Sequence, residues 1–341
     1  MKILTFVIPA YNSESFLDKC IPSMLQPEVL SEIEIIVVND GSKDTTPAVA
    51  QKYCDRYPDA VRLISQENKG HGGALNTGCA AAQGKYLKVI DADDWIVGEN
   101  LPAFVALLEQ CNSDVVLTHY HTIDISTGEV KSWKNYPEAF GKEYSFAEIM
   151  TQWRSFEHSM SLHGITYRTA FYQQIGHQLT EHVFYEDHEY ATYPCCYANG
   201  VMPVDLFLYE YRIGDVNQSV SNANQLKRLG HTQTVLRQMT ETYKTLPEMA
   251  GKQYAAMKIQ GLLLSYLTTA LLVEPDRKKG RAQAVRVFRE CCRRCPEVYD
   301  LARWKYQVFL LMNRMHISKQ TLNNLMTSRL YALIARKKKA D

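Results

Sequence analysis

The sequence has no apolar run long enough to cross a lipid bilayer. Its longest such run, Gly261–Val273, lies between Lys258 and Glu274, whereas a membrane-spanning helix needs about 18–20 apolar residues. The opening residues, MKILTFVIPAYN, hold an apolar stretch of only about seven residues that runs into Pro9, which is too short and wrongly flanked for a secretory signal. We therefore expect no membrane span and a cytoplasmic location.

Paired cysteines and an excess of one charge are also missing. The nine cysteines are odd in number and scattered, which indicates reduced thiols rather than disulfides. Cys292 and Cys295 have the spacing of half a zinc knuckle, but no second pair stands at ligand spacing. The 38 Lys and Arg residues nearly balance the 37 Asp and Glu residues, so the total charge alone indicates neither a nucleic-acid binder nor an acidic tail.

The composition and the early pattern of the chain indicate an α/β protein. With 341 residues, 46% of them hydrophobic and 22% charged, we expect a globular domain plus a substantial second unit. Runs such as IEIIVV, apolar on nearly every residue, are typical of parallel strands covered on both faces. We predict a doubly wound, mostly parallel sheet, with strands at 3–8, 33–38, 61–65 and 85–90 and helices at about 13–26, 44–57 and 71–83.

Polar clusters follow all four predicted strands. They are Pro9–Asn12, Asn39–Ser42, Asn68–Gly70 and Asp91–Asp94. Turn geometry and helix capping explain polar residues at any single strand-to-helix turn. They do not explain three carboxylates within the four residues 91–94, because like charges so close repel one another unless a cation or strong donors compensate. This cluster predicts a divalent cation.

The glycine-rich segment Gly70–Leu75 follows a predicted strand and opens a predicted helix, as a dinucleotide-binding loop does. Leu75 stands at the position of the third glycine of that fingerprint, and no Walker-type G-K-[ST] occurs, so neither NAD nor P-loop chemistry is supported. Glycines ahead of a helix still leave backbone N–H groups open to a phosphate.

Five motifs in order carry a family resemblance. They are VIPAYN (7–12), VVNDGSKDTT (37–46), NKGHGGALNTG (68–78), DADDW (91–95) and YEDHEY (185–190). This set closely resembles the family 2 glycosyltransferases of GT-A fold over roughly residues 1–220. The resemblance implies an inverting, metal-dependent transfer of one sugar from a nucleotide-diphospho-sugar, a UDP-sugar being expected. The acceptor implied is a hydroxyl of a saccharide or polyisoprenoid-linked glycan in cell-surface glycan synthesis.

The resemblance also implies a role for each motif by position. Asp93 would bind Mg²⁺ or Mn²⁺ on the diphosphate, and Asp187 would be the base that deprotonates the acceptor. Asp91 would face the ribose. The other donor-binding candidates are Pro9, Ala10, Tyr11, Asp40, Asn68 and Gly70.

Other interpretations stay open. Asp187 could be a helix N-cap with acidic neighbours in the first turn. A nucleotidyltransferase of related fold would need its own glycine-rich loop near the first strand, which VIPAYN lacks, and a non-catalytic binding scaffold would lose carboxylates that this chain keeps. Leu75 stands where the family often has Arg, which leaves the donor less certain. Asp300 precedes Arg303-Trp304 where processive members have Gln, which favours single-sugar transfer.

The near-neutral total conceals a division of charge. Residues 1–226 hold 15 basic and 29 acidic side chains, whereas residues 227–341 hold 23 and 8. Basic clusters stand at 277–281, 293–294 and 336–339, in a half with helical periodicity. We predict a glycosyltransferase domain at 1–220 and a basic helical region at 221–341. That region either docks on the acidic half or contacts anionic lipid, and no nucleic-acid partner is expected.

Overall fold

A computed structural model describes residues 2–215 and 222–321. The chain divides into two compact units. The first comprises Met1–Gln218 together with Leu246–Ala255, and the second comprises Ser219–Thr245 together with Ala256–Asp341. The domain boundary placed after residue 220 stays a prediction, and the structure adds that Leu246–Ala255 belongs with the first unit.

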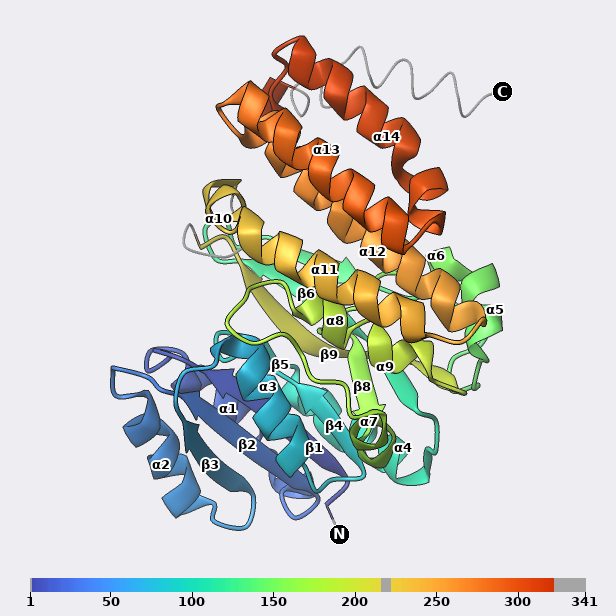
Figure 1. Ribbon diagram of the computed structural model, residues 1–341. Coiled ribbons are helices and arrows are strands. Elements are labelled where there is room, and N and C mark those ends of the chain that lie inside the picture. The colour runs from blue at the N-terminus through green and yellow to red at the C-terminus, as the bar shows by residue number, and fades with distance from the viewer. Residues whose placement is uncertain (1, 216–221, 322–341) are drawn as a thin grey trace. The chain divides into compact units, whose positions relative to one another are not determined.

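The first unit begins with the predicted βα units. Strands β1 (Leu4–Ala10), β2 (Ile33–Asp40), β3 (Val61–Gln66) and β4 (Tyr86–Val89) lie in the order β3-β2-β1-β4 and are all parallel. Helices α1 (Leu17–Met24), α2 (Thr46–Arg56) and α3 (Gly70–Ala81) connect them (Figure 1). Every residue of β1, β2 and β4 is buried, as the continuous apolar runs predicted. The α/β prediction is confirmed for this half of the sheet.

Beyond β4 the nine-stranded sheet is mixed. Strand β8 (Ile165–Arg168) pairs antiparallel with β4 and with β6 (Val115–Asp124). Strand β9 (Val201–Ile213) lies parallel to β6, and the short strands β5 (Trp95–Ile96) and β7 (Val130–Trp133) pair antiparallel with β9 and β6. The parallel pairing that the sequence predicts therefore holds for β1–β4 and for β6 with β9, whereas the pairs that involve β5, β7 and β8 are antiparallel. The segment η1 (Pro27–Val29) precedes β2, and the helical segments beyond β4 are η2 (Gly98–Asn100), α4 (Leu101–Gln110), α5 (Phe146–Thr151), α6 (Trp153–Phe156), α7 (Thr169–Ile175), α8 (Asp187–Tyr190) and α9 (Tyr193–Cys196).

The second unit is helical, as predicted. It contains α10 (Asn222–Lys227), α11 (Leu229–Thr245), most of α12 (Ala250–Thr268), the π-helical segment η3 (Thr269–Val273), α13 (Arg277–Arg294) and α14 (Glu297–Arg314). Helices α13 and α14 run side by side (Figure 1), with the rings of Phe288 and Tyr306 stacked at 3.9 Å between centroids. The predicted apolar periodicity at 322–334 and the basic cluster Arg336–Lys339 lie outside the described residues.

One helix is longer than the apolar run seen in the sequence. The helix continues from Val273 back to Ala250, and over this length it is long and apolar enough to cross a membrane. Of its most apolar window, 56% is buried within the protein. A core helix has the same length and composition, so this feature alone does not identify a span. All nine cysteines are free thiols, and most of them are buried.

Helix α3 packs closely on the parallel strands, and Gly78 allows this approach. A Cβ atom at Gly78 would lie 2.3 Å from Val7 Cγ1 and 3.0 Å from Val38 Cγ2, on β1 and β2. This close packing holds the later part of α3 against β1 and β2. By contrast, a Cβ at Gly261 in α12 would meet no atom within 4 Å.

Gly78→Ala is expected to destabilise the protein by about 1–2 kcal/mol. Overpacking a methyl group costs roughly 1–3 kcal/mol, and the better helix propensity of Ala offsets only up to about 1 kcal/mol. Gly261→Ala is the matched control and should leave stability unchanged or raise it. Urea unfolding followed by far-UV circular dichroism measures both. Equal stability of Gly78→Ala and the wild type would contradict the packing argument.

Candidate active site

The register of the parallel strands brings the first two motifs together. Ala10 lies opposite Asn39, so the loop after β1 begins beside the end of β2. Pro9 and Ala10 are buried, whereas the Tyr11 side chain is half exposed at the end of β1. The structure therefore places Pro9, Ala10 and Tyr11 next to the Asn39–Asp40 strand end, as the sequence predicts for a shared edge.

Asp40 is a buried carboxylate that organises the third motif. It is 2% exposed, and its Oδ1 accepts hydrogen bonds from Gln66 Nε2 and from the backbone N–H of Lys69, both at 2.8 Å. The amide of Asn68 donates to the Asp40 carbonyl at 2.9 Å. Asp40 thus fixes the loop between β3 and α3, and the structure brings Asp40 and Asn68 into contact.

Gly70 takes a backbone conformation that few other residues adopt. Its φ is +78°, and an added Cβ would lie 3.0 Å from the backbone nitrogen of His182. The N–H of His182 in turn donates to the Lys69 carbonyl at 2.8 Å. The structural reason for Gly70 is therefore the close approach of the chain just before α8. This contact joins the third motif to the fifth.

The carboxylates after β4 form a tight turn with different surroundings. Asp94 is 1% exposed, and its two oxygens accept hydrogen bonds from the Tyr209 hydroxyl at 2.5 Å and from the Arg212 N–H at 2.7 Å. Burial, together with the charges of Asp91 and Asp93, raises the pKa of Asp94 well above its usual value. Burial and the charge of Asp91 likewise raise the pKa of Asp93. The turn therefore concentrates negative charge.

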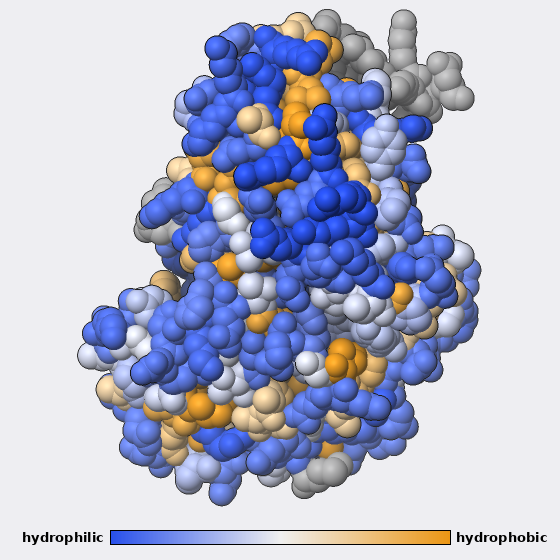
Figure 2. All heavy atoms as spheres, viewed as in Figure 1, coloured by the Kyte–Doolittle hydropathy of each residue, from blue (hydrophilic) through white to orange (hydrophobic). Residues whose placement is uncertain are grey.

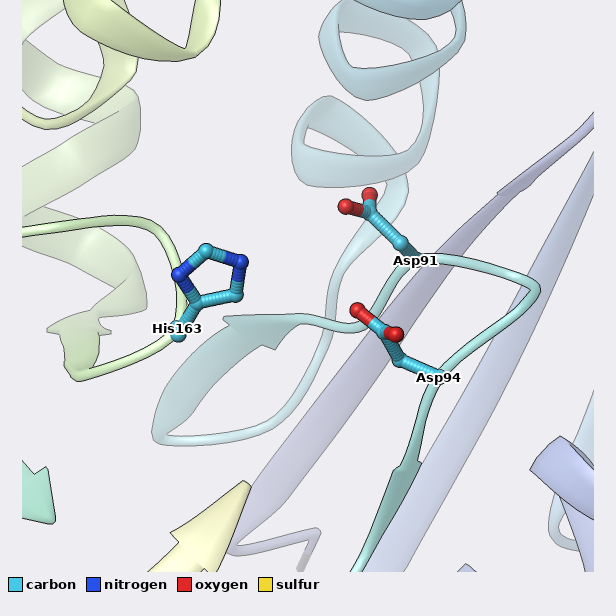
Figure 3. A group of neighbouring side chains, drawn as sticks. All are labelled: Asp91, Asp94 and His163. Atoms are coloured by element: carbon cyan, nitrogen blue, oxygen red, sulfur yellow. The ribbon is translucent and has the colours of Figure 1, made fainter. Parts of the chain in front are cut away.

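Asp91, Asp94 and His163 form a group of possible metal ligands. One ligand atom from each lies within 4.8 Å of the others. Figure 3 shows the two aspartates on the turn after β4 and His163 facing them from the loop before β8. Burial lowers the pKa of His163 to about 4, so its ring is neutral near pH 7 and one nitrogen has a lone pair that it can donate to a metal ion. Asp93, the residue that the resemblance implies for the metal, is not in this group.

A buried lysine donates hydrogen bonds to the backbone of the loop that carries His163. Lys88, on β4, is fully buried, and its ammonium donates to the carbonyls of His163 at 2.8 Å and Ile165 at 3.1 Å. Burial lowers the pKa of Lys88 to about 7. The His163 ring stacks on Tyr211 with centroids 4.1 Å apart. His163 is therefore positioned by its backbone and by its ring.

His71 joins the carboxylates after β4 to the segment that carries Asp187. From the first turn of α3, its Nε2 lies 2.9 Å from Asp91 Oδ1 and its Nδ1 lies 2.5 Å from Glu186 Oε1. Glu186 is 2% exposed. Burial alone would lower the pKa of His71, but the hydrogen bonds to the two carboxylates raise it well above its usual value. A protonated ring can donate to both of them.

Asp187 is the first residue of α8 and not its N-cap. The N-cap position belongs to Glu186, whose side chain makes no capping hydrogen bond and instead contacts His71. Asp187 is half-buried and shares an electrostatic environment with the turn after β4. Burial is the largest cause that raises the pKa of Tyr211, and the charges of Asp94, Asp91, Asp187 and Asp93 raise it further. The capping interpretation of Asp187 is therefore wrong.

Four residues near these carboxylates were not assigned roles from the sequence. His71 stood in a glycine-rich motif, and Glu186 was seen only as an acidic neighbour in a helical turn. His163 belongs to none of the five motifs. Arg212 also belongs to none of the five motifs, and its guanidinium lies 3.5 Å from Asp93 Oδ2 and 3.1 Å from Asp215 Oδ2. Only the proximity of the folded elements reveals these contacts.

Comparisons of the sequence with known proteins point to a single class. A family model described as Glycosyl transferase family 2 matches residues 5–176. The Bacillus subtilis protein described as uncharacterized glycosyltransferase EpsJ is 39% identical over 115 residues, covering 33% of either chain. Escherichia coli chondroitin synthase is 29% identical over 158 residues, covering 45% of this chain and 22% of the synthase. The matches thus span a third or less of these relatives' lengths.

The fold is similar to that of the S. aureus protein TarS. The structure of S. aureus TarS 1–349 in complex with UDP-GlcNAc aligns with a TM-score of 0.65 over 93% of this chain and 88% of that one. At 19% identity this likeness concerns the fold. It agrees with the predicted GT-A architecture with a helical C-terminal region.

His71 and Glu186 are expected to be energetically coupled. Removing one partner leaves the other with an unmatched buried polar group, which costs about 1–3 kcal/mol. The double variant His71→Ala/Glu186→Ala should therefore lose less stability than the sum of the two single variants, with a coupling of about 1–2 kcal/mol. Urea unfolding of the four proteins measures this coupling. Additive losses would show that the bridge contributes nothing to stability.

Proposed function

Because the chain belongs to glycosyl transferase family 2, we propose that it transfers a single sugar, with inversion, from a nucleotide-diphospho-sugar to an acceptor hydroxyl. The observation that carries the proposal is the arrangement of carboxylates at one sheet edge. Asp91, Asp93 and Asp94 follow β4, and Asp187 is the first residue of α8. The charges of all four raise the pKa of the Tyr211 hydroxyl, which indicates that the four carboxylates surround the same side chain. A metal-bound diphosphate and a proton acceptor need such groups on two sides of a reacting sugar.

The donor side of the proposal uses the ends of β1–β4. The loop Pro9–Tyr11 and Asp40 hold the nucleotide base, Asn68 and Gly70 border the donor, and Asp91 faces the ribose. The half-exposed ring of Tyr11 can stack on a base. We propose a UDP-sugar as donor, which the complex of the similarly folded TarS with UDP-GlcNAc supports.

A divalent cation, Mg²⁺ or Mn²⁺, suits the donor atoms of this site. Burial, followed by the charges of neighbouring aspartates, raises the pKa values of Asp93 and Asp94, and carboxylate oxygens are the ligands that hard cations prefer. Asp93 would hold the ion, because both oxygens of Asp94 are already hydrogen-bonded within the protein. When bound, the cation neutralises charge that develops on the leaving diphosphate.

Asp187 performs the proton transfer in this proposal. Its carboxylate takes the proton of the acceptor hydroxyl as that oxygen attacks the anomeric carbon opposite the leaving group. The new glycosidic bond forms while the bond from the anomeric carbon to the phosphate oxygen breaks, and the nucleoside diphosphate departs. His71 contacts both Asp91 and Glu186, the residue before Asp187. This bridge keeps the start of α8, which carries the proton acceptor, at a fixed distance from the turn after β4.

The acceptor and the setting complete the proposal. We propose a hydroxyl of a saccharide or polyisoprenoid-linked glycan, in cell-surface polysaccharide synthesis at the cytoplasmic face of the membrane. The chemistry of chondroitin synthase, a polysaccharide-forming relative by name, supports a saccharide acceptor.

Asp187→Asn should abolish transfer while leaving donor binding nearly intact. An amide cannot accept the acceptor's proton, and loss of a general base costs roughly 100- to 10,000-fold in rate. A screen of UDP-sugars by calorimetry identifies a donor, and transfer to saccharide acceptors is then followed as release of UDP. Loss of donor affinity in step with activity would instead show that Asp187 binds the donor.

Asp93→Asn should lower turnover about 100-fold or more, because it removes charge that stabilises the departing diphosphate. The variant should also need higher Mn²⁺ concentrations for donor binding, and chelation of the metal should reproduce the defect in the wild type. Asp205→Asn is the matched control, since the Asp205 side chain is 66% exposed and contacts His119. Full activity of Asp93→Asn would remove the metal assignment.

A further inference from the structure

Helix α14 in the second unit has two different faces. One face packs inside the unit, where Tyr306 stacks on Phe288 of α13 and the amide of Asn313 donates to the Leu271 carbonyl at 2.7 Å. Val298 and Ala302 are fully buried on this side. These contacts fix the rotation of α14 about its axis and so determine which side chains point away from the unit.

The opposite face carries a stripe of exposed apolar side chains. Trp304 is 71% exposed, Met315 62%, Leu311 56% and Leu301 44%, and Val308 between them is half-buried. The positions 301, 304, 308, 311 and 315 repeat at intervals of three and four residues, so they lie within an arc of roughly 80° on the helix surface. Large apolar side chains collected in this way indicate a binding surface rather than scattered exposure.

The charge around the stripe is mainly positive, and the exposed acidic residues Glu297 and Asp300 stand only at the first turn of α14, where Asp300 lies 3.8 Å from Arg303. Arg303, Lys305 and Arg314 are exposed, and Lys305 stands on the other side of the stripe from the two arginines. Over the described residues 301–321 the sequence contains four Lys and Arg residues and no Asp or Glu. Figure 2 shows apolar side chains among strongly hydrophilic ones over α13 and α14. The surface therefore combines an apolar centre with a surround that is basic beyond the first turn of α14.

We propose that the stripe on α14 is a docking surface for a bilayer that contains anionic lipid. Trp, Leu and Met on one side of a helix, flanked by Lys and Arg, match the layout of the membrane interface, where apolar groups enter the acyl boundary and cations remain at the phosphates. A second copy of this chain fits less well, because two such stripes would bring like charges together. The basic surround selects the anionic partner.

This inference does not depend on the proposed chemistry. The stripe is built within the second unit, and none of its residues belongs to the five motifs of the first. Membrane docking would bring the enzyme to lipid-linked substrates, but the surface can be tested without donor or acceptor. Failure of vesicle binding and failure of sugar transfer are therefore separate results.

Co-sedimentation of the full chain with vesicles tests the surface. The wild type should bind vesicles of phosphatidylcholine with phosphatidylglycerol and bind pure phosphatidylcholine at least tenfold more weakly. The double variant Trp304→Ala/Leu311→Ala should lose affinity for the anionic vesicles at least tenfold. Tyr136→Ala is the matched control, because it removes another aromatic ring, 67% exposed, from the first unit. Circular dichroism verifies that each variant is folded.

Fluorescence distinguishes insertion of the stripe from contact by charge alone. Trp304 is one of four tryptophans, and its emission should shift to shorter wavelength when vesicles are added. Trp304→Phe should keep most of the affinity and lose this shift. Sedimentation velocity tests for a second copy. The proposal is overturned if the wild type does not bind anionic vesicles at low salt, if the double variant binds as the wild type does, or if it changes only the oligomeric state.

Discussion

Mutual repulsion among Asp91, Asp93 and Asp94 is the constraint around which the first unit is organised. Three carboxylates within four residues destabilise a turn unless other groups compensate their charge. Asp91 contacts His71 of α3, whereas the partners of the other two lie on β9: the Arg212 guanidinium for Asp93, and the Tyr209 hydroxyl and the Arg212 N–H for Asp94. The turn thereby ties together elements far apart in the sequence. A cation at this place would complete the compensation that the protein groups begin.

The predictability of the fold follows the range of the interactions that form it. Strands β1–β4 and helices α1–α3 could be predicted because apolar runs and turn residues are local signals. The mixed half of the sheet could not. Its register depends on pairs such as Tyr86 with Arg168 and Trp95 with Glu210, and no local pattern records which distant strand a segment will join. The parallel pairing of β6 with β9 includes register irregularities that periodicity does not predict either.

The same distinction applies to the candidate site. The aspartates of the motifs could be located because each follows a recognisable strand or precedes a helical turn. His71, Glu186 and His163 carry no comparable signal, since a histidine inside a glycine-rich loop and a glutamate ahead of a short helix have ordinary local explanations. The importance of His71 and Glu186 comes from distances of 2.5 and 2.9 Å around one imidazole, and that of His163 from ligand atoms within 4.8 Å of Asp91 and Asp94. Asp40 shows the converse, because its position was predicted while its hydrogen bonds to Gln66 and Lys69 were not.

Buried Lys88 couples the folding equilibrium to proton binding. Burial lowers its pKa from 10.5 to about 7 in the folded protein. Between these pH values the unfolded chain holds a proton that the folded chain has released. The free-energy cost of burying Lys88 therefore falls, and the stability of the folded state rises, as pH increases through that window. Below it, both states are charged and the fold bears the whole desolvation cost. The backbone that presents His163 is therefore held by an ammonium in mild acid and by a neutral amine in mild alkali.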